Sequence, residues 1–314
     1  MVGWIILGVI SFVLLVCLIT LLVCFFKIFY SAQKKLEDES PNLPLPEGSV
    51  YEPFHDMMTK WILEKRKTPH RACETTSFDG LKLRAKYYEF DKNAPIEIML
   101  HGYRGSSERD LSGGVDRCRK LNHNVLMVDS RASAFSGGRV ISFGINERKD
   151  CEKWIEYVLK EINPNAKIIL SGVSMGASTV MNCASKDLPK NVVGVVADCG
   201  FTSASDIIKK VIDDMGLPSK ILYPFAKLSA KIFGRFNLEE TSSIESMKNS
   251  KLPVIFFHGN KDDFVPLEMS ERNYEACVSR KKLVIIEGAG HGLAFPVAQE
   301  KYVKEIKEFF KSIY

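Results

Sequence analysis

The chain has 314 residues, of which 46% are hydrophobic, 26% charged and 10% aromatic, and this balance excludes a disordered or fibrous protein. Its 43 basic and 38 acidic side chains leave a net charge of +5, which is too small for this length to indicate a nucleic-acid partner. The length would allow two domains, although a single α/β domain often takes about 200–250 residues.

The chain opens with an apolar segment. Residues 4–26 contain no charged side chain, and 23 residues in a helix extend roughly 34 Å at about 1.5 Å each. This length is enough to cross a hydrocarbon core of about 30 Å. A cleaved signal peptide is the alternative, but the segment is longer than the apolar region of a signal peptide, and no lysine or arginine precedes it. We therefore expect residues 1–30 to be a retained, single-pass transmembrane anchor.

The charges around this segment indicate the side of the membrane on which the rest of the chain lies. Lys27, Lys34 and Lys35 follow the segment, so the positive-inside rule places the C-terminal bulk in the cytoplasm. Scattered cysteines without a Cys-x-x-Cys pair agree with reduced thiols in that compartment. Residues 31–50, with their prolines and acidic side chains, are expected to form an extended linker to a globular domain over residues 51–314.

The globular part alternates β-rich runs with segments of helical spacing. Asp79 and Gly80 separate the first two runs and predict a hairpin. Six predominantly apolar runs follow, at residues 96–100, 125–128, 168–170, 192–197, 254–257 and 283–286. Strands that are apolar on both faces belong to a parallel sheet covered by helices on both sides. The sequence therefore predicts an α/β fold with an eight-stranded, mostly parallel sheet and an antiparallel hairpin at one edge.

One interval is too long for a simple crossover between strands. The residues between Asp198 and Val254 contain two stretches with helical spacing, at about 204–215 and 224–235, with Pro224 expected in a first helical turn. Ligands bind such sheets beyond the carboxyl ends of the strands. We expect an insertion at about residues 201–250 to form a small helical cap over that region.

A motif with catalytic meaning follows the run 168–170. Residues 172–176 read GVSMG, and in a strand–turn–helix setting this Gly-x-Ser-x-Gly pattern is typical of a sharply turned nucleophilic serine. The serine needs a base, and the base needs an orienting carboxylate. Asp262 and His291 each follow a later strand, which gives the chain order nucleophile, acid, base. The sequence therefore predicts Ser174, Asp262 and His291 as a catalytic triad.

Other residues compete for the role of the acid. Asp263 adjoins Asp262, and Asp198 also stands at the end of a predicted strand. Taken singly, Asp262 is also a common turn residue and His291 an ordinary loop histidine. The spacing within residues 258–266 (HGNKDDFVP) favours Asp262.

An acyl-transfer site also needs two N–H donors for the oxyanion. One donor is expected from the backbone of Met175, which follows the nucleophile. The other is expected from Tyr103, in the glycine-containing loop after the run 96–100. We expect His101 to hold that loop through side-chain hydrogen bonds rather than to act as a second base.

These segments together resemble the α/β-hydrolase superfamily over essentially residues 51–314. More narrowly, the chain resembles small membrane-anchored bacterial hydrolases of the branch related to prolyl-oligopeptidase and dienelactone hydrolase, and it is similar to eukaryotic depalmitoylating thioesterases. The resemblance implies a Ser-His-Asp mechanism without metal or organic cofactor, acting on esters, thioesters, amides or peptides. Many relatives carry Asp-x-Arg-x-His-Gly-x-Ser after the fourth strand, whereas the His-Gly is absent after Arg131 here.

We expect a membrane-anchored serine hydrolase that cleaves carboxylic esters or thioesters of small-molecule or acylated substrates through an acyl-enzyme. A serine peptidase or amidase of the same fold is one alternative, and a catalytically silent, membrane-tethered binding module is another. No glycine-rich nucleotide fingerprint, Walker motif or zinc-ligand spacing occurs in the sequence.

The second helical stretch of the cap carries both basic and apolar side chains. The basic residues share one predicted helical face, and they are Lys220, Lys227, Lys231 and Arg235. The apolar residues are Phe225, Leu228, Ile232 and Phe236. An ordinary amphipathic helix would turn its apolar face to the pocket and its lysines to water. The alternative is a cap that touches anionic lipid and admits an acyl chain from the bilayer.

Overall fold

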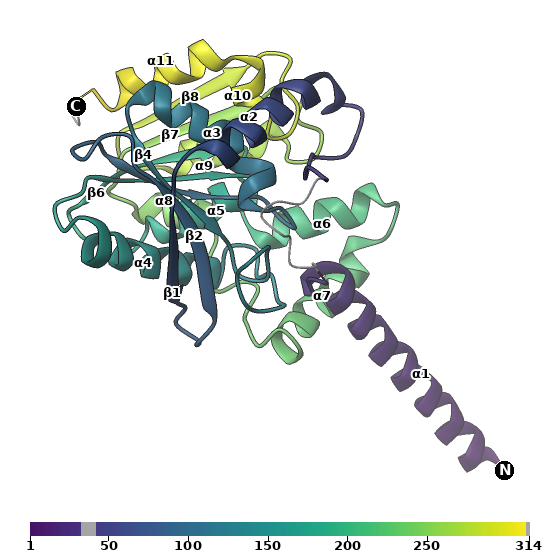
Figure 1. Ribbon diagram of the computed structural model, residues 1–314. Coiled ribbons are helices and arrows are strands. Elements are labelled where there is room, and N and C mark those ends of the chain that lie inside the picture. The colour runs from purple at the N-terminus through teal and green to yellow at the C-terminus, as the bar shows by residue number, and fades with distance from the viewer. Residues whose placement is uncertain (33–41, 312–314) are drawn as a thin grey trace.

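The computed structural model describes residues 1–32 and 42–311, and within these ranges eight strands form one sheet (Figure 1). The strands are β1 (Arg71–Thr76), β2 (Lys82–Tyr88), β3 (Ile96–Leu100), β4 (Asn124–Asp129), β5 (Ile168–Val173), β6 (Val192–Asp198), β7 (Val254–Gly259) and β8 (Lys281–Ile286). Their order is β1-β2-β4-β3-β5-β6-β7-β8. The hairpin strand β2 pairs antiparallel with β1 and β4, and the other neighbours are parallel. The predicted α/β architecture is confirmed.

Helices cover both faces of this sheet. The helices are α1 (Val2–Cys24), α2 (His55–Lys67), α3 (Ser107–Leu121), α4 (Glu147–Tyr157), α5 (Met175–Cys183), α6 (Ala204–Asp214), α7 (Ser219–Ile232), α8 (Ser243–Asn249), α9 (Leu267–Ala276), α10 (Ala294–Val297) and α11 (Gln299–Phe309). Helices α2, α10 and α11 contact α3 on one face, whereas α4, α5, α8 and α9 form a chain of contacts on the other (Figure 1). Every residue of β3 and β4 is buried, as expected for strands between two helical layers.

The parallel order brings the carboxyl ends of β5, β6, β7 and β8 to one edge of the sheet. Ser174 directly follows β5, and Asp198 is the last residue of β6. Asp262 and His291 lie in the loops that follow β7 and β8. The fold therefore gathers these four polar residues at the edge where doubly wound sheets bind ligands.

The cap helices α6 and α7 lie between β6 and β7, as expected, but α7 begins earlier than the sequence indicates. It starts at Ser219, so the predicted start at Pro224 and the placement of this proline in a first turn are wrong. The side chain of Asp213 accepts hydrogen bonds from the backbone N–H and the hydroxyl of Ser219, at 3.2 and 2.9 Å. This contact fixes the helix start, and Pro224 is tolerated inside the helix at the cost of one backbone hydrogen bond.

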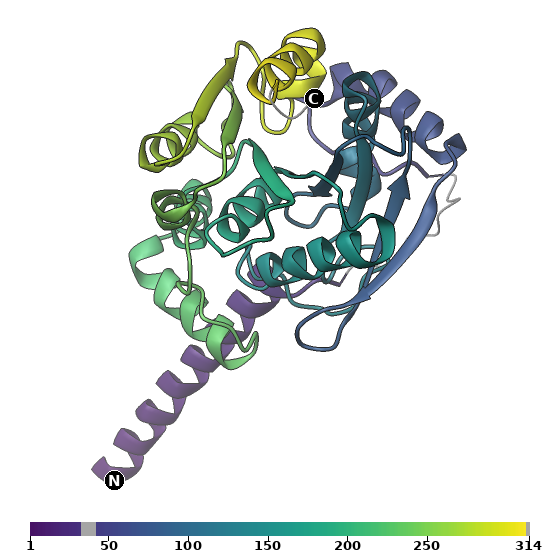
Figure 2. The same ribbon diagram turned by 90° about the vertical axis from the view of Figure 1, so that its left-hand side faces the viewer.

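Helix α1 continues into a π-helical turn, Phe25–Phe29, and leaves the globular part as a rod (Figures 1 and 2). Within the described residues it is the one helix long and apolar enough to cross a membrane, and a signal sequence would meet the same criteria. Its residues up to Val16 are exposed, whereas Cys24, Phe25 and Phe29 are buried. Of the expected linker 31–50, residues 33–41 lie outside the described part of the chain.

The end of this N-terminal helix is part of a hydrophobic cluster of the globular domain. Phe29 is fully buried, and its ring lies 5.9 Å from that of Phe143 and 5.5 Å from that of Phe236. Tyr30 forms a β-bridge with Val140 in the segment after β4. The chain therefore enters the globular domain through packing and backbone pairing rather than through a free tether.

We predict that Phe29→Ala lowers the free energy of unfolding of the globular domain by about 3 kcal/mol, because truncating a buried phenylalanine leaves a cavity. Phe26→Ala is the matched control, since Phe26 is 53% exposed, and it should change stability by less than about 1 kcal/mol. Urea unfolding of the full chain in detergent micelles, followed by near-ultraviolet circular dichroism, measures both. Equal effects of the two substitutions would contradict the packing of Phe29.

Candidate active site

Ser174 occupies a strained turn between β5 and α5. Its φ of +56° and ψ of −118° are rare for a residue with a side chain and cost about 1–3 kcal/mol. A Cβ on Gly172 would lie 2.2 Å from the carbonyl carbon of Gly176, and a Cβ on Gly176 would lie 2.1 Å from the carbonyl oxygen of Leu100. Both flanking positions therefore require glycine, which explains the Gly-x-Ser-x-Gly pattern in this chain.

The structure brings Ser174, His291 and Asp262 together. The hydroxyl of Ser174 donates to Nε2 of His291 at 2.9 Å, and Nδ1 of His291 donates to Oδ2 of Asp262 at 2.7 Å. The aromatic ring of Phe264 lies 5.0 Å from the imidazole of His291 and restricts its movement. A proton on the serine can therefore pass to an imidazole that a carboxylate orients.

The carboxylate of Asp262 is held in its charged form. Its Oδ1 accepts hydrogen bonds from the backbone N–H groups of Phe264 and Val265, at 3.0 and 2.8 Å. Burial alone would raise the pKa of Asp262, but hydrogen bonds from His258 and His291 outweigh it and lower the pKa to about 2. Asp262 is therefore suited to stabilise a positive charge that develops on His291.

His258 is a residue whose role the sequence argument missed. It is fully buried, and its Nε2 lies 3.3 Å from Oδ2 of Asp262 while donating to the carbonyl of Val265 at 2.8 Å. Its Nδ1 accepts from the hydroxyl of Ser270 at 2.7 Å. His258 thus ties the loop of Asp262 to β7 and α9. The four-residue spacing between His258 and Asp262 was the available signal.

The two backbone amides that the sequence predicts as oxyanion donors belong to Met175 and Tyr103. Met175 is the first residue of α5, so its N–H has no partner within the helix. The N–H of Gly102 is occupied, because it donates to Oδ2 of Asp110 at 3.1 Å. Within the described residues no hydrogen bond engages the N–H of Met175 or Tyr103. A Cβ on Gly102 would lie 3.5 Å from Cβ of Ser174, which shows how closely this loop approaches the serine.

His101 behaves as expected for a residue that holds this loop. Its Nδ1 lies 2.8 Å from the carbonyl oxygen of Gly102, and its Nε2 accepts from the backbone N–H of Ser130 at 3.0 Å. These bonds connect the loop after β3 to the loop after β4 and leave neither ring nitrogen for the reaction.

The same loop also forms hydrogen bonds with the end of the N-terminal helix. The hydroxyl of Tyr103 donates to the carbonyl of Ile28 at 2.7 Å. The guanidinium of Arg104 donates to the carbonyls of Lys27 and Tyr30, at 2.9 and 3.1 Å. These carbonyls carry the negative end of the helix dipole, so the arginine is favourably placed. No sequence pattern marks this contact, because backbone carbonyls are present in every segment.

A cavity of about 270 Å³ opens beside Ser174 and His291. Its walls include apolar side chains of α2, α3, β3 and α10, namely Met58, Trp61, Ile62, Met99, Leu111 and Phe295. Arg117, Asp198 and Tyr302 also line it. The volume is near the lower end of the range for small-ligand pockets, and the apolar wall suits an acyl chain.

Asp198, the alternative acid, makes no hydrogen bond to the imidazole of His291 within the described residues. Its Oδ2 accepts from the hydroxyl of Tyr302 at 3.0 Å, and its Oδ1 has no partner within the described residues. Burial raises the pKa of Asp198, and the hydrogen bond from Tyr302 lowers it by less, so the pKa is about 6. The geometry therefore pairs His291 with Asp262 and not with Asp198.

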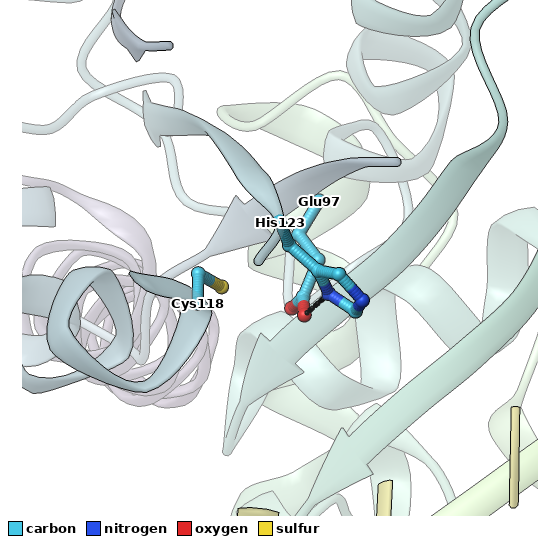
Figure 3. Close-up of side chains that lie close together, drawn as sticks. All are labelled: Glu97, Cys118 and His123. Carbon is cyan, nitrogen blue, oxygen red and sulfur yellow. Dashed lines mark hydrogen bonds and ion pairs between the residues drawn. The ribbon is translucent and has the colours of Figure 1, made fainter. Parts of the chain in front are cut away.

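A second group of polar side chains lies where β3 packs against α3. Here Glu97, Cys118 and His123 come close together (Figure 3). One oxygen of Glu97 accepts from Arg117 at 2.5 Å and the other from Nδ1 of His123 at 2.7 Å. Burial would raise the pKa of Glu97, but these two partners lower it to about 2, whereas burial raises that of the Cys118 thiol. The adjacent guanidinium and a protonated thiol disfavour a metal ion, so we interpret the group as a structural ion pair.

We predict that Asp198→Asn removes a pH dependence of stability. In the wild type the folded pKa of about 6 exceeds the ordinary value of 3.8, so the stability that Asp198 contributes is fully present below about pH 4 and is lost as the pH rises through about 6. The difference amounts to about 3 kcal/mol. Thermal unfolding of both proteins between pH 4 and pH 8 should show the variant gaining on the wild type across this window. Parallel curves would contradict the raised pKa.

Comparison with known proteins places this arrangement in a family. The model of the prolyl oligopeptidase family matches residues 125–314. The YqkD protein of Bacillus subtilis is 29% identical over 194 residues, which cover 62% of this chain and 64% of that protein. Protein bem46 of Schizosaccharomyces pombe is 27% identical over 196 residues, which cover 62% and 60%. The chain thus spans less than two thirds of the length of these relatives.

Solved structures support the same fold. An esterase of Pyrococcus furiosus superposes with a TM-score of 0.63 at 23% identity, covering 79% of this chain and 94% of that one. An acylaminoacyl peptidase of Pyrococcus horikoshii superposes with a TM-score of 0.56 at 18% identity, covering 80% and 42%. With the eight-stranded sheet and the family match, these likenesses show that the chain belongs to the prolyl oligopeptidase family and has the α/β-hydrolase fold.

Proposed function

We propose that this protein is a membrane-anchored serine hydrolase that cleaves carboxylic esters or thioesters through an acyl-enzyme on Ser174. The observation that carries the proposal is the continuous series of hydrogen bonds from Asp262 to His291 to Ser174, at 2.7 and 2.9 Å. It stands beside an apolar-walled cavity at the carboxyl edge of the sheet.

The reaction follows from the positions of these groups. His291 Nε2 takes the proton of Ser174 while Oγ attacks the carbonyl carbon, and the amides of Met175 and Tyr103 donate to the developing oxyanion. His291 then returns the proton to the departing alcohol or thiol, which leaves the acyl group on Ser174. Water deprotonated by His291 attacks this acyl-enzyme, and the carboxylic acid leaves as the serine is restored. Asp262 stabilises the imidazolium in both steps.

The cavity favours an acyl substrate over a peptide. A peptidase of this fold that holds a free N-terminus needs an unpaired carboxylate in the cavity. Asp110 lines the cavity but accepts from Arg109 at 2.6 Å and from Gly102. Asp198 accepts from Tyr302 through Oδ2 and leaves Oδ1 without a partner within the described residues, so it is the carboxylate of the lining that a peptide N-terminus would use, whereas the largely apolar wall favours an acyl chain. The esterases among the structural relatives, and a thiohydrolase of Aspergillus aculeatus that is 28% identical over 153 residues, point the same way.

A peptidase remains the second candidate, because the family takes its name from an oligopeptidase and one structural relative is an acylaminoacyl peptidase. Kinetic comparison of an acyl p-nitrophenyl ester with the matching acyl-amino p-nitroanilide separates the two. A kcat/KM for the ester at least about 100-fold higher supports the esterase.

The buried end of α1 supports a retained anchor. Cleavage near Ser31 would remove Phe29 from a closed cluster, break the bridge of Tyr30 to Val140 and leave Tyr103 without its acceptor. A signal peptide has no such structural role in the mature protein. We propose that the catalytic domain lies on the cytoplasmic side, on the strength of the lysines that follow the apolar segment.

We predict that Ser174→Ala abolishes labelling by a fluorophosphonate and lowers ester turnover by at least about 1,000-fold, because no other nucleophile replaces Oγ. Intact mass should show one adduct on the wild type and none on the variant. Thermal unfolding within about 2 °C of the wild type would show that the fold is kept. A well-folded wild type that takes up no adduct would instead favour the silent binding module.

We predict that Asp262→Asn lowers kcat by about 1,000-fold or more, since the imidazole loses the carboxylate that orients and stabilises it. Asp198→Asn is the matched control, because it makes the same chemical change at a neighbouring strand end. Its kcat should stay within about threefold of the wild type. Steady-state kinetics on a short p-nitrophenyl ester checks both, and the reverse ranking would make Asp198 the acid.

A further inference from the structure

The cap helix α7 is apolar on two opposite sides. One side is buried in the cluster that includes Tyr223, Ala226 and Ala230. The other side carries Ile221, Leu228 and Ile232, which are 62%, 45% and 50% exposed. Spacings of seven and four residues place these three side chains on one stripe of the helix. The sequence expectation that Leu228 and Ile232 turn toward the pocket is therefore wrong, because the helix buries its opposite side.

This stripe continues into the preceding turn, where Met215 is 68% and Leu217 is 43% exposed. We call the set Met215, Leu217, Ile221, Leu228 and Ile232 the cap patch. Single exposed apolar side chains are common on soluble proteins, whereas a run of five along one helix and its turn marks an interaction surface.

Basic side chains border the cap patch. Lys220, Lys231 and Arg235 are exposed, and Lys227 lies on the same side of the helix while it pairs with Glu239. A stripe of apolar side chains beside a stripe of lysines is typical of a helix that lies in the surface of an anionic membrane.

The position of α7 beside α1 indicates that the bilayer covers the cap patch. The two helices lie side by side, and the rings of Phe25 and Phe233 are 5.5 Å apart (Figure 2). Within α1 the residues up to Val16 are exposed, and partial burial begins at Cys17. The helix carries no charged side chain up to Phe26, so the part of α1 beside α7 is as well suited to the hydrocarbon core as the exposed part is.

We propose that the cap patch is a membrane-docking surface, which inserts beside α1 into the same bilayer leaflet, with its lysines and arginine at the anionic headgroups. The inference rests on the proposed retention of α1 as an anchor. Insertion places the exposed apolar stripe in the hydrocarbon of the bilayer, so the stripe needs no protein partner to cover it.

This docking sets the height of the active site. Ile28 lies at the end of the apolar span, where the N-terminal helix meets the globular domain. Tyr103 donates to the carbonyl of Ile28, and the adjacent Gly102 approaches Ser174. The serine therefore stands close to the headgroups, and the class of substrate that fits this height is an acyl ester or thioester presented by the bilayer.

The direct test uses the full chain in vesicles of phosphatidylcholine and phosphatidylserine. Leu228→Cys is treated with a charged, membrane-impermeant maleimide. Leu63→Cys is the matched control because Leu63 is 43% exposed and belongs to α2, a helix that lies away from α1 (Figures 1 and 2). We expect labelling at position 228 to be at least tenfold slower than at position 63, as read by intact mass. Equal rates would overturn the docking surface.

A second arm measures the consequence for hydrolysis. Leu228→Glu should lower the hydrolysis of a long-chain ester embedded in the vesicles about tenfold and leave that of a water-soluble short-chain ester unchanged. Leu63→Glu should change neither. Equal hydrolysis of the embedded ester by the wild type and Leu228→Glu would overturn the assigned substrate class.

The two arms separate the possible failures. Slow maleimide labelling of Leu228→Cys, together with a wild type that hydrolyses no ester, would refute the proposed function and keep the docking surface. Intact mass and resistance to alkaline extraction report whether α1 is retained. Loss of α1 from the mature chain would overturn the docking surface together with the anchor.

Discussion

The structure depends on the way in which the end of α1 is held by the domain that follows it. Three features hold residues 25–30: Phe25 and Phe29 are buried, Tyr30 pairs with Val140, and Tyr103 and Arg104 donate to backbone carbonyls. The accepting carbonyls are those of Lys27, Ile28 and Tyr30. Because both donors belong to the loop after β3, the end of the N-terminal helix and the proposed oxyanion loop share one set of hydrogen bonds. A movement of either one therefore strains the other.

The loop after β4 takes part in the same arrangement. The backbone N–H of Ile141 donates to the carbonyl of Phe29, and that of Ser31 donates to the carbonyl of Arg139. This is the region in which the chain departs from the His-Gly of many relatives. In this protein the loop contacts the end of the N-terminal helix, and the ring of Phe143 from the same segment lies 4.9 Å from that of Tyr103. The departure thus has a structural counterpart in how the end of α1 packs on the domain.

The sequence predicts the sheet well because strands buried on both faces consist mainly of apolar residues, and such runs are visible in the sequence. The run 96–100 is β3 itself, and the predicted hairpin at Asp79 and Gly80 joins β1 to β2. The start of α7 was missed because the carboxylate of Asp213 fixes it from a distance of six residues. The contact of Tyr103 with α1 was missed because it joins a phenol to a backbone carbonyl 75 positions away, and carbonyls carry no sequence signal.

The same limit explains why two aspartates at neighbouring strand ends look equivalent in the sequence and differ in the fold. Both Asp198 and Asp262 are buried, yet burial raises the pKa of the first to about 6 and donors lower that of the second to about 2. Asp262 gains its donors from a tight turn, whose amides at Phe264 and Val265 bond one oxygen while His291 bonds the other. Asp198 ends its strand without such a turn and receives a single phenol. The local path of the backbone after the strand, rather than the residue type, decides which carboxylate keeps its charge beside the imidazole.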